Sequence, residues 1–544
     1  MKHAMTFTRQ AALCALALAA AAPALGQTPP DAGQVYQQMQ PDTAAPLAPS
    51  VDIDLRGEPL RDRKAGGARA RITRIDFQGN ALYSDAELLT ALGDVLGKAY
   101  DLAGLQALAN RVSRHYREHG YPFARAVLPA QSLDDGRLRL DIIEGHYGEV
   151  AASGEPRLAS AVQAYLRPLK AGEPIASDAL ERTLLIAGDL PGVRLTPVMR
   201  PGERHGTGDL DVRVAAAPRV SGEVALDNHG SRYSGEYRAR GRLAVNRVLM
   251  VGDEASLTAL YTSEDTWFGD IRYSLPLGSS GLRGSVAYAH TDYQLGKGFE
   301  GYTGTAKIGS LGLSYPLIRR QQANFLLTAA WQHKDLDDTA EDILYDKAAT
   351  SQSLPLGLRF DVRDGLAGGG VSYGGLVITP VQFESRQTGL ADADYGLTKV
   401  NLELARLQAL GGGLTLFGRF SGQWADREVI DGSESFYLGG PDGVRAYPVG
   451  EGSDSRGWLA QLELRYRAPR GLEPFLFFDA GRTPGGGVNR DERRNISGGG
   501  LGLRYGIGAL QLELSSAWAV DGGDALSDDK QRTPRVWGSI AYGF

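Results

Sequence analysis

Cysteine is almost absent from this chain, because a single residue, Cys14, occurs among 544. It lies inside an apolar N-terminal run, so cleavage of that run would leave no thiol at all. Disulfide scaffolds, thiolate metal sites and cysteine nucleophiles are thereby excluded for the mature chain. Methionine is also scarce, with 5 residues, whereas glycine (71) and tyrosine (23) are abundant. Such a composition is typical of proteins built from many short strands and turns.

Long hydrophobic runs are the second absence. Beyond the N-terminus, no stretch reaches the roughly 18 uncharged apolar residues that a membrane-spanning helix needs. If the chain enters a membrane, it must do so as a closed β-barrel, because only there are all strand backbone groups paired away from water. The 58 basic and 64 acidic residues give a net charge of −6 without a basic tail, so no nucleic-acid partner is expected.

The first 26 residues are predicted to be a secretory signal peptide. Two basic residues precede an apolar run over 11–22, and the Ala-Leu-Gly sequence at 24–26 supplies a cleavage site with small residues. Leu13 is too bulky for the position before a lipoprotein cysteine, so no lipid anchor is expected. The mature chain is therefore expected to leave the cytoplasm.

Two similar α+β domains are predicted after a linker. In the first, residues 69–145, the expected elements are a strand at 72–77, a helix opened by the Ser84-x-x-Glu87 capping box, a helix at 102–119, and strands at 123–128 and 138–143. A weaker copy of this order covers residues 146–217, which indicates a tandem repeat. Residues 27–68, rich in Pro, Ala and Gln, are predicted to be a linker with a short helix around 34–40.

From residue 218 to 544 apolar and polar residues alternate, which predicts strands to the end of the chain. A soluble sandwich would alternate in the same way. About sixteen segments of roughly ten residues fit, however, with short turns alternating with long polar loops such as 426–456, and these features favour a transmembrane barrel of about 16 antiparallel strands. Tyr542 and Phe544 share one face of the last strand, as the assembly signal of outer-membrane barrels commonly does.

In such a barrel the charged face of each strand points into the lumen. Arginine is frequent on these faces and acidic residues are fewer, which predicts a wet, cationic passage. The arginines expected to line it are Arg238, Arg240, Arg242, Arg272, Arg359, Arg465, Arg467 and Arg504.

Two short motifs are the most specific features of the barrel region. Their residues are Gly443, Val444, Arg445, Ala446 and Tyr447 in the long loop, and Phe477, Asp479 and Gly481 on the second strand after it. The simplest interpretation is an ordinary turn cluster and a strand that carries one lumen charge. The order and spacing of the two motifs favour a functional pair instead.

These motifs resemble the V-R-G-Y and F-x-D-x-G motifs of two-partner secretion transporters, the ShlB/FhaC/HecB-like family, with Ala446 at the family's glycine position. The tandem domains resemble POTRA domains, and the Gly-Tyr-Pro step at 120–122 is similar to the first POTRA domain of that family. The resemblance implies that Arg445 pairs with Asp479 inside an outer-membrane pore whose N-terminal domains lie in the periplasm.

The function implied by this resemblance is export of an unfolded partner exoprotein, of the large β-helical adhesin or haemolysin type, to the cell surface. The other implied partners are outer-membrane lipid, the barrel-assembly machinery and periplasmic chaperones. No cofactor, metal or enzymatic activity is expected.

Three other functions stay open from the sequence. His115, Glu118 and His119 match the H-x-x-E-H pattern of a zinc-peptidase helix, although no third ligand is evident. An assembly factor for outer-membrane proteins would typically carry more POTRA domains, and a passive solute porin would not need the tandem. The glycine-rich segments at 411–413 and 498–502 do not open helices, so they are predicted to be strand glycines and not phosphate loops.

Overall fold

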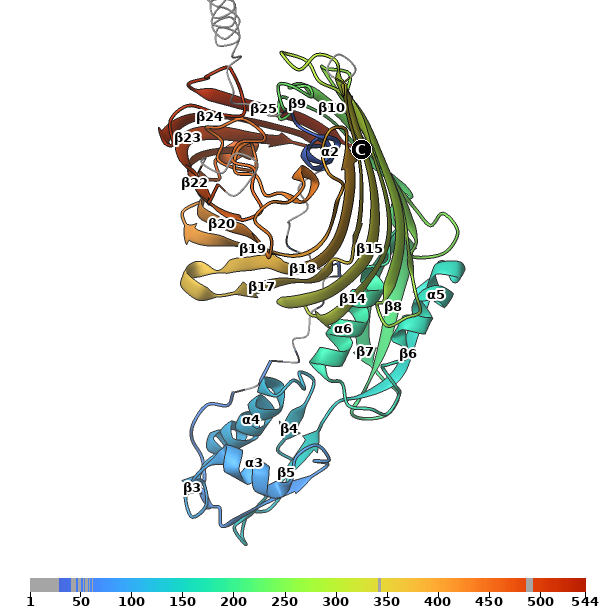
Figure 1. Cartoon of the computed structure of the whole chain (residues 1–544). Coiled ribbons are helices and arrows are strands. Elements are labelled where there is room, and N and C mark those ends of the chain that lie inside the picture. Colours follow the sequence, from blue (N-terminus) through green and yellow to red (C-terminus); the bar gives the residue numbers. More distant parts are fainter. Residues whose placement is uncertain are drawn as a thin grey trace, which may run out of the picture.

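The computed structural model describes residues 29–40, 46, 50, 51, 53, 57, 59, 60, 62–340, 344–485 and 493–544. Within this part of the chain, two small α+β units precede one large barrel (Figure 1). The signal peptide predicted at residues 1–26 lies outside the described residues. Among the helices described, none has the length and apolar character to cross a membrane.

The first α+β unit has the order that the sequence predicts. Its elements are β1 (Ala70–Arg71), β2 (Arg74–Gln78), α3 (Asp85–Leu92), β3 (Ala99–Tyr100), α4 (Leu102–Glu118), β4 (Arg125–Val127) and β5 (Arg137–Ile143). Strand β5 lies in the centre of the sheet, parallel to β2 and antiparallel to β4. The predicted capping box forms, because the Ser84 side chain accepts from the Glu87 backbone N–H while the Glu87 carboxylate accepts from the Ser84 N–H.

The second α+β unit repeats this topology. Its elements are β6 (His146–Gly154), α5 (Pro156–Leu166), α6 (Ser177–Gly188), β7 (Val193–Pro201) and β8 (Thr207–Ala216). The central strand β8 is parallel to β6 and antiparallel to β7, as β5 is to β2 and β4. The weak sequence repeat therefore corresponds to a repeat in three dimensions.

The barrel follows without a break and closes on itself, since β25 pairs with β9. Its strands are β9 (Val220–Asp227), β10 (Arg238–Asn246), β11 (Glu254–Thr262), β12 (Trp267–Pro276), β13 (Arg283–Gln294), β14 (Tyr302–Arg319), β15 (Ala323–Ala340), β16 (Tyr345–Ser353), β17 (Leu356–Asp364), β18 (Gly370–Gln387), β19 (Ala393–Gly411), β20 (Leu414–Ala425), β21 (Gly457–Tyr466), β22 (Leu472–Thr483), β23 (Arg494–Ile507), β24 (Leu510–Asp521) and β25 (Arg535–Gly543). Three short 3₁₀ turns are η2 (Leu366–Gly368), η3 (Gly432–Glu434) and η4 (Pro469–Gly471).

Strands β16 and β17 occupy one position in the wall, because both lie between β15 and β18. The seventeen strands therefore form sixteen wall positions, all paired antiparallel, which confirms the predicted architecture. The interruption falls at Leu354-Pro355, where proline has no N–H to donate to the ladder.

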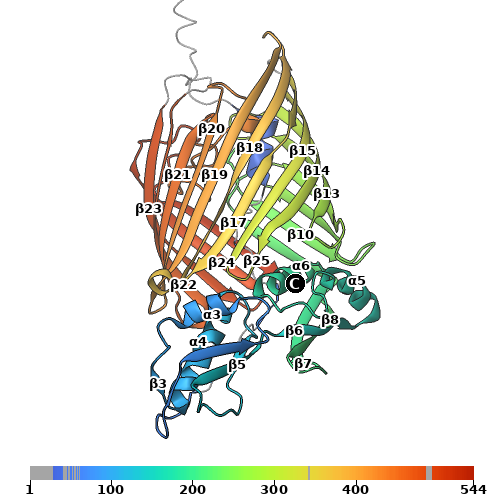
Figure 2. The ribbon, with the colours of Figure 1, turned by 90° about the horizontal axis from the view of Figure 1, so that it is seen from below.

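The second α+β unit lies against the turns at one end of the barrel, the domain end, and the opposite end carries the longer loops (Figure 2). The Tyr165 hydroxyl donates to the Gly278 carbonyl at 3.1 Å in the β12–β13 turn. Beside the β14–β15 turn, both Nε and a terminal nitrogen of Arg319 donate to the Asp189 carboxylate at 2.7 Å. The unit is thus fixed to two neighbouring hairpins.

The linker contributes to the same junction. Val51 and Ile53 are 3% and 8% exposed and belong to the hydrophobic core of the second α+β unit. The Ser50 hydroxyl donates to the Leu185 carbonyl at 3.2 Å, and the Gln321 amide donates to the Ile53 carbonyl at 2.9 Å. Ser50, Val51 and Ile53 therefore lie between this unit and the barrel, although they precede the first α+β unit in the chain.

Replacement of Asp189 by asparagine is expected to loosen this junction. The Arg319 side chain is only 3% exposed and would lose its carboxylate, whereas the Asp189 side chain is 39% exposed, so the cost should be about 1–2 kcal/mol rather than that of a fully buried pair. Pulsed EPR between labels on introduced cysteines in α5 and the β12–β13 turn should show a broader distance distribution. Arg320→Ala, which breaks the exposed pair with Asp178, is the matched control. An unchanged distribution for Asp189→Asn would show that this pair does not hold the unit in place.

Candidate functional site

The long loop between β20 and β21, residues 426–456, folds back into the barrel (Figure 1). Leu438 and Val444 are fully buried and Tyr447 is 1% exposed. They form one hydrophobic cluster with wall residues such as Phe475 and Phe477. A loop that is polar in overall sequence thus has its own apolar contacts with the inner wall.

Arg445 is the electrostatic centre of this loop. Its Nε and one terminal nitrogen donate to the two oxygens of Asp479 on β22, at 2.8 and 2.7 Å. Its other terminal nitrogen donates to Glu463 on β21 at 2.6 Å. The Asp479 side chain is fully buried, and those of Arg445 and Glu463 are each 5% exposed. One guanidinium therefore pairs with two acidic side chains on adjacent strands, with bidentate geometry toward Asp479.

The face of the Arg445 guanidinium and the backbone around Arg445 make further contacts with the wall. The guanidinium lies 3.6 Å from the ring centroid of Phe477, within the range of a cation–π contact. The Trp537 indole N–H on β25 donates to the Arg445 carbonyl at 2.8 Å, and the Gln461 amide donates to the Gly443 carbonyl at 2.9 Å. The loop is thus attached to β21, β22 and β25, the last of which closes the barrel.

Glycines on the wall provide the space for this contact. A Cβ on Gly481 would lie 2.8 Å from the Leu438 side chain, and a Cβ on Gly498 would lie 2.5 Å from the Cβ of Ala446. Gly498 therefore permits close approach of the loop and is not part of a phosphate-binding turn. Ala446 itself does not have a positive φ, so alanine is accommodated at this position without backbone strain.

The outer part of the loop is tied to the loop between β24 and β25. The Glu451 carboxylate accepts from the backbone N–H groups of Leu526 and Ser527 at 3.0 and 2.9 Å. Arg494 pairs with the same carboxylate at 2.6 Å. The Tyr447 hydroxyl is 2.9 Å from the Asp521 carbonyl at the end of β24 and 3.0 Å from the Gly523 carbonyl in that loop, and donates to them. Both ends of the motif segment are therefore anchored.

A helix, α2 (Ala32–Met39), occupies the remaining centre of the barrel (Figure 1). Ala32 and Val35 are fully buried and Met39 is 2% exposed, in one cluster with inner-wall residues such as Phe268 and Phe383. The sequence predicts a short helix at this place in the chain but not its location in the lumen. The lumen therefore contains both a helix and the inserted loop.

Ion pairs hold the N-terminal end of α2. Asp31 caps the helix by accepting from the Gln34 N–H at 2.9 Å and pairs with Lys347 on β16 at 3.0 Å. Asp338 on β15 accepts from the Ala32 N–H at 2.7 Å. These acidic groups lie at the positive end of the helix dipole, where negative charge is favoured.

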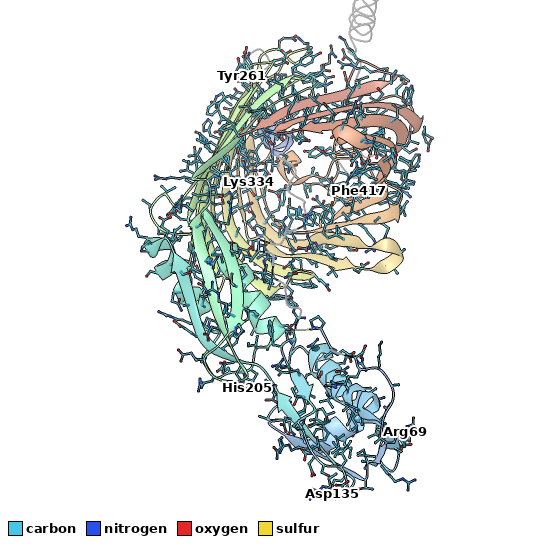
Figure 3. The ribbon with its side chains drawn as sticks, turned by 180° about the vertical axis from the view of Figure 1, so that it is seen from behind. Arg69, Asp135, His205, Tyr261, Lys334 and Phe417 are labelled. Atoms are coloured by element: carbon cyan, nitrogen blue, oxygen red, sulfur yellow. The ribbon has the colours of Figure 1, made fainter. Side chains whose placement is uncertain are left out.

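The helix also contacts the inserted loop through η3. Glu434 of η3 is 1% exposed and lies between Lys334 at 2.5 Å and Lys399 at 2.6 Å; Figure 3 shows Lys334 inside the ring of strands. The Gln37 amide of α2 donates to the Ser433 carbonyl, and Asp431 shares Lys347 with Asp31, at 2.7 Å from the ammonium. Helix, loop and wall thus form one connected network.

Comparisons with known proteins agree with this geometry. Residues 206–505, more than half of the chain, match the family model of the haemolysin secretion/activation protein ShlB/FhaC/HecB, and residues 70–145 match the ShlB-type POTRA domain. The chain belongs to this family of two-partner secretion transporters. Its first α+β unit is a POTRA domain. The membership of this family that the two barrel motifs predicted is confirmed.

Individual relatives resemble the transporter over nearly its whole length. The heme/hemopexin transporter protein HuxB of Haemophilus influenzae is 25% identical over 535 residues, 93% of this chain and 94% of that protein. The hemolysin transporter protein ShlB of Serratia marcescens is 24% identical, over 94% of this chain and 90% of that protein. The solved structure of CdiB from Escherichia coli aligns with a TM-score of 0.70 over 94% of this chain and 96% of that chain, at 20% identity, which shows a shared fold.

The transporter is therefore an outer-membrane protein that exports a partner exoprotein, with its N-terminal domains in the periplasm. The domain end of the barrel is the periplasmic end, and the loop end faces the exterior. Proteins of this family are transporters and not enzymes.

Most of the predicted lumen arginines lie on the inner wall, and several are paired with acids there. These pairs are Arg238 with Asp227 at 2.7 Å, Arg240 with Glu223 at 3.2 Å, Arg465 with Glu463 at 2.7 Å and Arg504 with Glu513 at 3.0 Å. Arg242 lines a chamber of about 570 Å³ beside α2 and the loop, and Arg359 lines a second cavity of about 300 Å³. Arg272 lies on the face of β12 opposite the exposed Ile271. Arg467 is exposed one residue beyond the end of β21.

The remaining predicted residues lie apart from the loop site. Tyr542 and Phe544 are 50% and 62% exposed on the outer surface at the barrel seam, where the Phe544 N–H donates to the Gly222 carbonyl at 2.9 Å. The His115 and His119 rings lie 4.3 Å apart at the end of α4, beside Tyr83. In the part of the chain that the structure describes, no three His, Cys, Asp or Glu side chains form a group that could hold a metal ion.

Sequence reasoning missed two groups that hold Arg445. Glu463 alternates with the outward-facing Leu462 and Leu464, so the sequence indicates its lumen position but not its contact with the loop. Trp537 alternates with the outward-facing Val536 on the last strand, and that alternation is the only signal that could have placed its indole inside.

Removal of the guanidinium in Arg445→Ala should release the loop, because it leaves Asp479 and Glu463 buried without their shared cation. The expected cost is about 3–5 kcal/mol of loop docking, with secretion of the exoprotein reduced sharply while the protein still reaches the membrane. Limited proteolysis of the loop in outer-membrane vesicles, together with a secretion assay, would measure both effects. Arg427→Ala, in the same loop but exposed against Tyr395, serves as the control. Normal secretion by Arg445→Ala would remove the loop from the mechanism.

Proposed function

We propose that this arrangement is the closed state of the export pore, and that α2 and the loop at 426–456 open or rearrange when the transporter passes an unfolded exoprotein. The observation that carries this proposal is the occupied lumen: α2 lies inside it, packed against the inner wall, but is not part of the wall. Its ion pairs and hydrogen bonds, such as the pair of Asp31 with Lys347, can be replaced by hydrogen bonds to water when the helix leaves. The apolar contacts of Val35 and Met39 set the barrier to release.

The proposed cargo is a large secreted β-helical protein of the adhesin or haemolysin type. The names of two relatives, a hemolysin transporter and a heme/hemopexin transporter, support a cargo that acts on host cells or haem proteins. A chain of this kind must stay unfolded in the periplasm, so periplasmic chaperones are proposed as transient partners. The barrel-assembly machinery is proposed to recognise the C-terminal face with Tyr542 and Phe544, and outer-membrane lipid to surround the wall.

The POTRA domain and its repeat are proposed to capture the cargo. In each three-stranded sheet the two outer strands have a free edge within their own sheet, namely β2 and β4 in the first unit and β6 and β7 in the second. An extended chain can add to such an edge through backbone hydrogen bonds alone, without one required sequence. The docked second unit then presents its bound segment next to the barrel entrance.

Export can be tested in a strain that makes the transporter together with the exoprotein encoded beside it. Deletion of residues 69–145 should abolish secretion into the medium, because capture is lost, while the barrel still reaches the outer membrane with a heat-modifiable band shift. The amount of exoprotein in medium and periplasm is measured by immunoblot. Undiminished secretion by the deletion variant would contradict capture by this domain.

Closure by α2 can be tested by single-channel recording in planar bilayers. Lys347→Gln removes the cation shared by Asp31 and Asp431, so the helix should leave the lumen more often and the fraction of time in high-conductance states should rise several-fold. Lys530→Gln, in an external loop, is the matched control. Deletion of residues 29–40 should give the largest rise, and a conductance equal to the wild type in that variant would show that α2 does not close the pore.

A further inference from the structure

The outer surface of β14 changes abruptly from apolar to cationic. Leu313 and Leu311 are 51% and 56% exposed, as expected for side chains that face hydrocarbon. The next positions on this face, toward the exterior, are Gly309 and Lys307, because alternate residues of a strand share a face. The change takes place within two positions, which locates the headgroup level of the outer leaflet at Gly309.

Two tryptophans lie on the same outer surface, on β12 and β15. Trp267 of β12 and Trp331 of β15 are 41% and 45% exposed on the outer face, as in the aromatic belts of membrane proteins. The His290 ring is stacked on Trp267 with centroids 4.9 Å apart, and the His333 ring is stacked on Trp331 at 6.2 Å. Both imidazoles are thereby held at the lipid headgroup level.

Strand register brings these imidazoles to the two sides of β14. Lys307 is the Cα partner of His290 on β13, and Gly309 lies between Tyr288 on β13 and His333 on β15. Neighbouring strands are about 4.8 Å apart, so the three nitrogen-bearing side chains surround Gly309. A Cβ added to Gly309 would meet nothing within 4 Å, so the missing side chain leaves a notch in this surface.

The charged groups at the notch are one ammonium, that of Lys307, and the carboxylates of Asp292 and Asp335, each of which holds one imidazole. The Nε2 of His290 is 3.0 Å from Asp292, and that of His333 is 3.1 Å from Asp335, so each carboxylate orients one ring. Lys307 is the Cα partner of Asp335, yet within the described ranges it has no hydrogen-bond or ion-pair partner. Its ammonium is therefore free to bind an anion at the membrane surface.

We propose that this notch binds a glucosamine phosphate of lipopolysaccharide, the phosphorylated glycolipid of the outer leaflet. The Lys307 ammonium contacts the phosphate, and the His333 imidazole donates its remaining N–H when protonated, whereas both ring nitrogens of His290 already have partners in Asp292 and Tyr288. The sugar ring packs against the aromatic faces of Tyr288 and Trp331. The acyl chains lie along Leu311 and below it, on the apolar part of β14. The level of the site and the aromatic walls favour this glycolipid over a phospholipid of the inner leaflet.

Bound lipid would stabilise the wall that also carries the second α+β unit. The β12–β13 and β14–β15 hairpins have their outer ends at the notch and their periplasmic turns at Gly278 and Arg319, the two contacts of that unit. The lipid would therefore fix these hairpins at the end opposite the junction. This inference does not depend on the identity of the exoprotein or on the movement of α2.

The binding experiment uses the full mature transporter, purified in detergent and freed of glycolipid, with bisphosphorylated lipid A as the probe. Native mass spectrometry gives the apparent Kd. Lys307→Gln should weaken binding about ten-fold or more, the loss expected for one charge-assisted contact. Gly309→Val fills the notch without changing any charge and should weaken binding by a similar factor.

The controls are Lys297→Gln, in the external loop of the same β13–β14 hairpin, and Gly241→Val, at an open outer position of β10. Both should bind lipid A as the wild type does. Equal binding by wild type, Lys307→Gln and Gly309→Val would refute the site. Equal affinity for lipid A without its phosphates would refute phosphate recognition, and equal affinity for phosphatidylglycerol or inorganic phosphate would refute the assignment to a glycolipid.

Discussion

The width of the closed wall is the constraint on which the other features of this transporter depend. A ring of sixteen strand positions satisfies the backbone in the membrane, but it leaves a lumen too wide for the inner side chains to fill. The interior must therefore be filled by segments from elsewhere in the chain or remain open to water. The structure uses two such segments, a loop that is continuous with the wall and a helix that reaches the lumen from the N-terminal side.

The two segments are attached by opposite charge arrangements. The loop presents a cation, Arg445, to two acids of the wall, and η3 presents an acid, Glu434, to two lysines of the wall. Charges in a lumen are stable in such mixed clusters, because each buried charge keeps a partner. This explains why the inner wall is rich in both signs and why its arginines form pairs instead of one uniformly cationic surface.

Sequence reasoning predicted the elements well because their signals are local. The capping box at Ser84, the short helix before residue 40 and the long loop after residue 425 depend on neighbouring residues and occur where they were expected. The positions of these elements relative to one another could not be predicted in this way. The contact of Ala32 with Asp338 joins residues 306 positions apart, and no periodicity reports it. The pairing of Arg445 with Asp479 was expected only from the family resemblance.

The burial of Val51 and Ile53 in the second α+β unit has a consequence for how far α2 can travel. Ten peptide steps separate Gln40 from Ser50, so a fully stretched tether would allow the end of the helix about 35 Å from its anchor. A helix attached by so short a linker has an effective concentration at the lumen on the order of millimolar. In the proposed cycle, re-entry of α2 is therefore an intramolecular event that needs no second factor.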